Sequence, residues 1–176
     1  MTCIVAISDG KNVWMGGERG HSTKGWIGSS TQPKVYKVGE YLIGYSANAG
    51  IGQQIVYNFD FQDYTPAEGT DPVYFLMTNF IPRLKAYFKD NDINVVGEDI
   101  EADLLLGFHG RVYEINTGHM YCTEYDHIAT GSGYEYALGS LYSSTHLPPR
   151  ERIELALNAA IAYSPSCQGP LDIFSL

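Results

Sequence analysis

The sequence has little of what defines membrane-spanning, disulfide-bonded or zinc-binding proteins. Its 176 residues include three cysteines, Cys3, Cys122 and Cys167, and none belongs to a Cys-x-x-Cys pair. An odd number of widely spaced cysteines predicts reduced thiols, and neither a disulfide framework nor a zinc site. No apolar run approaches the roughly 20 residues that a helix needs to cross a bilayer. We therefore expect a cytoplasmic protein without membrane association.

Basic residues are scarce, since 11 Lys and Arg face 20 Asp and Glu, for a formal net charge of −9. Nucleic acids and anionic membranes both require clustered Lys and Arg, so neither is an expected partner. Cofactor motifs are also lacking. The five histidines show no metal-site spacing, and no glycine-rich segment reads G-x-x-x-x-G-K-[ST]. We expect no metal and no cofactor.

Predicted strands and helices occur in separate groups along the chain. Short apolar or alternating segments predict strands at 1–8, 12–15, 34–38, 41–45, 102–108, 111–115, 120–125, 128–130 and 171–174. Apolar residues at helical spacing predict helices at 47–59, 73–89, 134–144 and 150–163, the second kinked at Pro82. We expect Gly16 and Gly17 to end the second strand, and a loop to follow over 20–31.

This grouping is typical of an α+β domain, because a parallel sheet would require alternating strands and helices. Two antiparallel sheets stacked face to face, each covered by a helix pair, would bury every apolar face. The sequence contains no linker, repeat or low-complexity tract, so we expect residues 1–176 to form a single domain.

The N-terminus offers a nucleophile. Threonine is small enough for methionine aminopeptidase to remove Met1, which would leave Thr2 with a free α-amine beside its hydroxyl. An α-amine with a pKa of about 7.7–8.0 can act as a general base at neutral pH. Met-Thr alone is a weak signal. The neighbouring Cys3 is expected to point to the opposite face of the strand.

Charged residues could support this nucleophile. Lys34 is predicted at the start of a strand that could run beside the first, where its ammonium would lower the pKa of the Thr2 hydroxyl and amine. Glu18, just after the double glycine, could orient Lys34. The alternatives are a solvated lysine at a strand end and an exposed Glu18–Arg19 pair that contributes about 0–1 kcal/mol.

Two helix starts could complete a site for acyl transfer. The run Ser46 to Gly50 and the turn Gly131-Ser132-Gly133 both precede predicted helices, whose unpaired N–H groups can receive an oxyanion. Ser132 could also bond to the Thr2 amine. Ordinary helix caps are the alternative for both segments.

Several of these segments together resemble a known family. The segments are T-x-I-V-x-I from Thr2, G-G-E-R at 16–19, P-K-V-Y-K-V at 33–38, G-Y-S-A-N-A at 44–49, I-A-T-G-S-G-Y-E-Y-A-L-G-S-L at 128–141, E-R-I-E-L-A-L-N-A-A-I-A at 151–162 and G-P-L-D-I-F-S-L at 169–176. This series resembles the proteasome β-subunit superfamily, most of all the bacterial HslV-type peptidases. The resemblance covers nearly the whole chain and is diffuse between about residues 58 and 126.

The resemblance implies an N-terminal threonine peptidase that hydrolyses peptide bonds. Thr2 matches the nucleophile, Lys34 the catalytic lysine and Glu18 the position of an aspartate. Ala47 matches the glycine whose N–H forms the oxyanion hole, and Ser132 the serine beside the amine.

The family architecture is the four-layer αββα sandwich of N-terminal-nucleophile hydrolases. Its members form homo-oligomeric stacked rings around a chamber, and an AAA+ ATPase unfoldase supplies unfolded protein or peptide. We therefore expect a cytoplasmic ring protease, with the ring order left open.

Three departures from the family pattern keep alternatives open. Glu18 is one methylene longer than the usual aspartate, so its contact with Lys34 must be rebuilt. Ser164 and Cys167 replace an aspartate and a serine that support the site in many β-subunits. A catalytically inactive scaffold subunit with the same fold would suit these changes, and a small-molecule amidase using the same nucleophile is a third reading.

Overall fold

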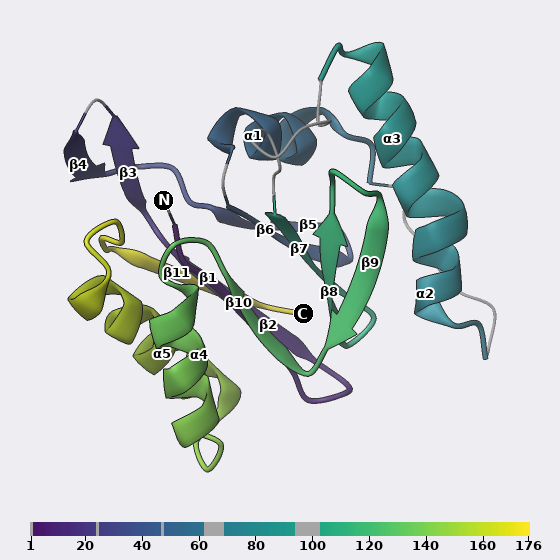
Figure 1. The fold of residues 1–176 in the computed structure, drawn as a ribbon. Coiled ribbons are helices and arrows are strands. Elements are labelled where there is room, and N and C mark those ends of the chain that lie inside the picture. Colours follow the sequence, from purple (N-terminus) through teal and green to yellow (C-terminus); the bar gives the residue numbers. More distant parts are fainter. Residues whose placement is uncertain (1, 24, 47, 62–68, 94–102) are drawn as a thin grey trace.

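The structure, a computed structural model, contains three antiparallel sheets (Figure 1) and describes residues 2–23, 25–46, 48–61, 69–93 and 103–176. A four-stranded sheet has the order β10-β1-β2-β11, with β1 at Ile4–Ser8, β2 at Val13–Glu18, β10 at His127–Thr130 and β11 at Leu171–Ser175. A five-stranded sheet runs in sequence order through β5 (Val35–Val38), β6 (Tyr41–Tyr45), β7 (Asp103–Phe108), β8 (Arg111–Asn116) and β9 (Tyr121–Tyr125). Strands β3 (Gly20–Thr23) and β4 (Trp26–Ser29) form a separate hairpin.

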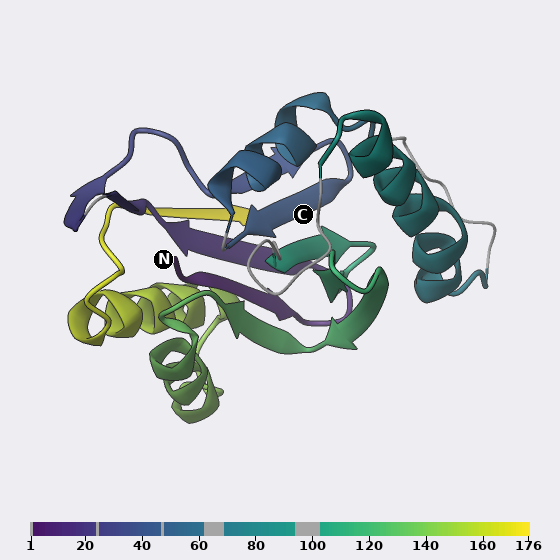
Figure 2. The same ribbon diagram turned by 45° about the horizontal axis from the view of Figure 1, so that its top comes forward.

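The four-stranded sheet is covered on both faces because β1 alternates between two cores. Cys3, Val5 and Ile7 pack with helices α4 (Tyr134–Ser143) and α5 (Pro149–Tyr163). Ile4 and Ala6 pack into the interface with the five-stranded sheet. Figures 1 and 2 show α4 and α5 on the side of the four-stranded sheet that faces away from the other sheet. The strand predicted at the N-terminus is therefore confirmed as one buried on both faces.

The five-stranded sheet carries the other helices on its outer face (Figure 2). Tyr41 and Leu104 pack there with Ile55 of α1 (Ala49–Asn58). Phe80 and Leu84 come from a second helical stretch, made of α2 (Pro72–Phe75), the π-helical η1 (Leu76–Phe80) and α3 (Ile81–Asp90). The predicted α+β class with antiparallel sheets is thus confirmed.

The double glycine does not end the second strand as predicted, because β2 continues through it to Glu18. A Cβ atom on Gly16 would lie 2.6 Å from the Ile153 side chain of α5, and one on Gly17 would lie 2.7 Å from that of Ile4. The glycines therefore mark a close approach to neighbouring elements, and the strand continues because its pairing with β1 and β11 is uninterrupted.

The segment after β2 also differs from the prediction. Residues 20–31, expected as a loop, contain the β3–β4 hairpin, in which His21 pairs with Gly28. Lys34 precedes β5, which pairs with β6 in the five-stranded sheet and not with β1. Lys34 consequently approaches Thr2 from the opposite sheet.

A π-helical turn, Leu76–Phe80, ends two residues before Pro82, the position of the predicted kink. Proline has no N–H to give to the preceding turn, and a wider turn accommodates its ring. Residues 94–102, between this helix and β7, lie outside the described residues. Among the residues that are described, no helix combines the length and apolar character that a membrane span requires.

Candidate active site

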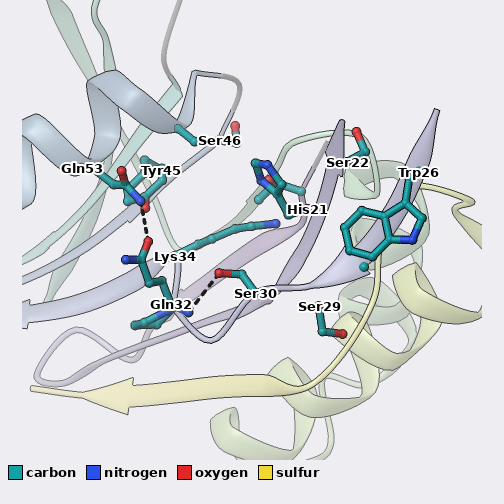
Figure 3. Close-up of a pocket in the computed structure, with 14 residues that line it drawn as sticks. His21, Ser22, Trp26, Ser29, Ser30, Gln32, Lys34, Tyr45, Ser46 and Gln53 are labelled. Atoms are coloured by element: carbon teal, nitrogen blue, oxygen red, sulfur yellow. Dashed lines mark hydrogen bonds between the residues drawn. The ribbon is translucent and has the colours of Figure 1, made fainter. Parts of the chain in front are cut away.

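Thr2 lies two residues before the start of β1 and lines a cavity of about 470 Å³. Figure 3 shows ten other residues of this cavity with labels. The cavity walls come from the β3–β4 hairpin, from residues 29–34 and from the start of α1. Figure 3 shows Lys34 extending past Gln32 toward His21. Gln53 of α1 donates to the Gln32 side chain at 2.7 Å and so links two walls. Thr2 itself is only 5% exposed and belongs to the lining of this cavity.

Glu18 is completely buried and accepts a bond from four donors. One carboxylate oxygen accepts from Lys34 Nζ at 2.7 Å and from the Cys3 N–H at 3.1 Å. The other accepts from the N–H of Gly20 at 2.5 Å and of Gln168 at 2.8 Å. Lys34 also donates to the Gly20 carbonyl oxygen. The longer glutamate thus reaches Lys34, and neither residue is the solvated surface charge of the alternative interpretation.

Arg19 turns to a different partner. Its guanidinium makes a two-pronged ion pair with Asp172 of β11, with both N···O distances at 2.6 Å, and donates to the Thr31 carbonyl oxygen at 2.8 Å. Such paired contacts fix geometry as well as charge. Arg19 therefore anchors the base of the hairpin to β11, and the alternative interpretation, an exposed Glu18–Arg19 pair, is wrong.

The turn that opens α4 holds the backbone of Thr2. The Thr2 nitrogen donates to Ser132 Oγ at 3.2 Å, and the Gly133 N–H donates to the Thr2 carbonyl oxygen at 3.2 Å. Gly131 has a φ of +86°, and a Cβ atom there would lie 2.3 Å from that carbonyl oxygen. Only glycine permits this approach, which brings Ser132 to the amine position.

Two groups of polar residues beside the site were missed by sequence reasoning. Ser166 Oγ lies 2.7 Å from Ser132 Oγ, and the only sequence signal was the Ser-Pro-Ser-Cys run that contains it. Asp103 accepts from Ser46 at 3.0 Å and from Thr130 at 2.8 Å, and so fixes a hydroxyl on the cavity wall. Asp103 opens an apolar strand, where a lone carboxylate gives no sign of its partners.

The start of α1 contributes the remaining wall. Asn48 caps the helix by accepting from the Ile51 N–H at 3.1 Å, and Ala49 lines the cavity. The run predicted to open a helix therefore does so. Ala47, the predicted oxyanion-hole residue, lies outside the described residues.

The buried cysteines are poor rivals to Thr2 as nucleophiles. Burial raises the pKa of the Cys3 thiol far above its ordinary range, and the nearby Cys167 adds to the effect. Burial likewise raises the pKa of Cys167. Because the thiolate is the reactive form, both thiols are inert at neutral pH. Within the described part of the chain, no group of three or more His, Cys, Asp or Glu side chains is placed to hold a metal ion.

No family model and no curated protein sequence matches this chain. Solved structures do match it along its length. Thiobacillus denitrificans BPH, in complex with epoxomicin, has a TM-score of 0.80 at 18% identity, covering 100% of this chain and 98% of that one. Eukaryotic HslV from Trypanosoma brucei has a TM-score of 0.70 at 15% identity, with 99% of both chains covered. Anbu, an ancestral β-subunit from Yersinia bercovieri, has a TM-score of 0.70 at 13% identity, covering 99% of this chain and 81% of that one.

These likenesses establish the fold. The resemblance to the proteasome β-subunit superfamily, stated above from motifs, is confirmed at the level of architecture by proteins named HslV, BPH and Anbu.

Proposed function

We propose that the chain is a threonine peptidase subunit of the proteasome β type. The observation that carries the proposal is the position of Thr2, which shares one cavity with Lys34 while its nitrogen bonds to Ser132. A hydroxyl nucleophile, a buried ammonium and an oriented amine are the groups that acyl transfer from an N-terminal threonine requires. Thr2, just before β1, supplies the hydroxyl and the amine, Lys34, just before β5, supplies the ammonium, and Ser132, in the turn before α4, orients the amine.

The proposed reaction begins after removal of Met1. The Thr2 amine, directly or through a water molecule, takes the hydroxyl proton as the oxygen attacks the peptide carbonyl. The Lys34 ammonium, fixed by Glu18 at 2.7 Å, stabilises the negative charge on the Thr2 oxygen. The Ala47 N–H is proposed to bind the tetrahedral oxyanion. The amine returns the proton to the leaving nitrogen, and water then hydrolyses the Thr2 ester.

The packing supports the finer architectural proposal of a four-layer αββα sandwich for the domain 1–176. One apolar cluster joins α4 and α5 to the four-stranded sheet, a second lies between the sheets, and a third joins the five-stranded sheet to α1 and α3. By analogy with the family, we further propose homo-oligomeric stacked rings in the cytoplasm, an AAA+ ATPase partner and unfolded polypeptide substrates.

Intact mass spectrometry tests the nucleophile. The protein as isolated from cells should lack Met1 and should gain one adduct from a peptide vinyl sulfone, in parallel with hydrolysis of a fluorogenic peptide. Thr2→Ala should lose both the adduct and the hydrolysis, whereas Thr145→Ala, the same change at an exposed loop position, should retain both. Hydrolysis that persists in Thr2→Ala would refute the mechanism.

An inactive scaffold subunit is the second candidate. The observation that favours it is the uncharged character of Ser164 and Cys167, both buried beside the site where many β-subunits carry an acidic residue. A scaffold would assemble into rings with the same number of subunits as Thr2→Ala, would retain Met1 and would take no adduct.

A further inference from the structure

Three serine hydroxyls form a line that leads away from the Thr2 nitrogen. Ser132 Oγ lies 3.2 Å from that nitrogen and 2.7 Å from Ser166 Oγ. Ser166 Oγ lies 3.0 Å from Ser164 Oγ, and Ser164 donates to the Ser132 carbonyl oxygen at 3.5 Å. Ser164 and Ser166 are only 4% and 9% exposed, so bulk water competes little for these bonds.

The distances select one direction for this line. Ser132 Oγ is closest to Ser166 Oγ, at 2.7 Å, whereas its alternative acceptor, the Thr2 carbonyl oxygen, is 3.4 Å away. A Ser132 proton placed on Ser166 leaves Ser166 to donate to Ser164 at 3.0 Å and Ser164 to donate to the Ser132 carbonyl oxygen, so each hydroxyl keeps an acceptor. The adjacent Cys167 thiol, a weak acceptor, also contacts Ser132 and Ser164. With its proton committed, Ser132 Oγ faces the Thr2 nitrogen as an acceptor.

This direction matters for a neutral amine that acts as a base. If Ser132 lacked Ser166 as an acceptor, its proton could turn to the Thr2 carbonyl oxygen, 3.4 Å away, or to the lone pair of the amine. A proton on the lone pair would compete with the one that the amine must take from the Thr2 hydroxyl. Hydrogen bonds in a chain also polarise one another, so Ser166 makes Ser132 a better acceptor.

The segment that carries Ser166 is held at a second point. The Gln168 N–H donates to the buried Glu18 carboxylate, which also holds Lys34. We infer that Ser166 is a positioning residue that orients the Ser132 hydroxyl and thereby keeps the lone pair of the Thr2 amine available. The inference rests on the proposed function for its catalytic consequence, although the orientation itself can be measured without turnover.

The test compares Ser166→Ala with Ser143→Ala, the same change on the exposed face of α4. Each protein is made as a fusion whose cleavage leaves Thr2 first, and intact mass verifies the terminus. One readout is the pH profile of kcat and kcat/KM on a fluorogenic peptide. The other is competitive acetylation of the α-amine with acetic anhydride across pH, which gives the amine pKa whether or not the protein hydrolyses peptides.

Ser166→Ala should lower kcat about five- to tenfold, the effect of one hydrogen bond, with KM unchanged. Its amine pKa and the acid limb of the kcat/KM profile should both move to lower pH, because the ammonium loses a strong acceptor and the neutral amine gains a donor. Ser166→Thr, which keeps the hydroxyl, should restore the wild-type amine pKa. Ser143→Ala should match wild type.

An amine pKa in Ser166→Ala equal to that in Ser143→Ala overturns the inference, even if kcat falls. If Ser166→Ala does not fold, the near-isosteric Ser166→Cys, a weaker hydrogen-bonding group, replaces it with the same expected direction and the same refuting result. If wild type hydrolyses no peptide but the amine pKa still shifts, the peptidase proposal fails and the positioning role stands.

Discussion

Replacing Glu18 with glutamine should strongly destabilise the fold. The change preserves the shape of the side chain and removes its charge. Each carboxylate oxygen accepts from two donors, Lys34 Nζ with the Cys3 N–H on one side and the N–H groups of Gly20 and Gln168 on the other. Whichever way the amide turns, its NH₂ group therefore meets two donors, and Lys34 loses its counter-charge.

The size of the effect follows from burial. Glu18 is fully buried, and the Lys34 side chain is 11% exposed. Removing one partner of a buried ion pair costs about 3–5 kcal/mol, because the other charge stays desolvated. For a chain of this size, that loss corresponds to a fall in melting temperature of roughly 6–20 °C. Adding Lys34→Met to Glu18→Gln should recover most of the loss, because no buried charge then remains.

Thermal unfolding followed by circular dichroism measures this loss, at neutral pH and matched protein concentration, since subunit association would shift the midpoint. Glu124→Gln is the matched control. Its carboxylate pairs with Arg111 at 2.5 Å, but the two side chains are 36% and 49% exposed, so the pair contributes about 0–1 kcal/mol. If the two glutamine variants melt within about 2 °C of each other, the buried ion pair does not carry the stability assigned to it.

Four further predictions concern packing, capping and ionisation. Gly17→Ala should lower the free energy of unfolding, measured in urea, by about 1–3 kcal/mol, because the added Cβ would overlap the side chains of Ile4 in β1 and Val35 in β5. Asn48→Ala should cost about 1 kcal/mol through loss of the α1 cap, and Asn48→Asp should restore it. Cys3 and Cys167 should resist a thiol-specific disulfide reagent at neutral pH until urea unfolds the chain. Burial and the neighbouring Asp103 carboxylate raise the pKa of Glu114, so its ionisation opposes folding as pH rises through that pKa. Glu114→Gln should therefore raise the urea midpoint of unfolding at neutral pH and change that midpoint less in acid.

Much of the fold could be predicted because the spacing of apolar residues along the chain indicates which faces of helices and strands are buried. The alternation in β1 and the stripe through Leu84 and Phe88 of α3 identified both elements and their buried sides. Boundaries shifted by a few residues, as they commonly do where the last turn or pair frays.

Prediction from the spacing of residue types failed at two places, the double glycine and the segment that follows it. Glycine ends many strands, yet Gly16 and Gly17 lie inside β2 because neighbouring side chains leave no space for a Cβ atom. The β3–β4 hairpin was missed because its two strands have only four residues each and their apolar residues, Trp26 and Ile27, are adjacent and exposed, so no apolar alternation marks it.

Some residues of the candidate site could likewise be predicted from the sequence, and others could not. Motif resemblance pointed to Thr2, Lys34, Glu18 and Ser132, and the structure brings all of them around the start of β1. Resemblance did not reveal that Ser166 bonds to Ser132, because the two residues are 34 positions apart and nothing in either segment encodes the distance.

Close backbone approach explains why short motifs persist in a chain only 13–19% identical to proteins of the same fold. A Cβ atom on Gly17 would lie 2.7 Å from the Ile4 side chain, which would have to shift, and one on Gly131 would lie 2.3 Å from the Thr2 carbonyl oxygen, so that the α4 turn itself would have to move. Core positions such as Leu84 only need an apolar side chain of suitable volume, and cores tolerate such exchanges when total volume is kept. Steric constraint at the backbone of Thr2, together with the charge of Lys34 and Glu18, therefore restricts the segments that build the site more than the core between residues 58 and 126, where the resemblance is diffuse.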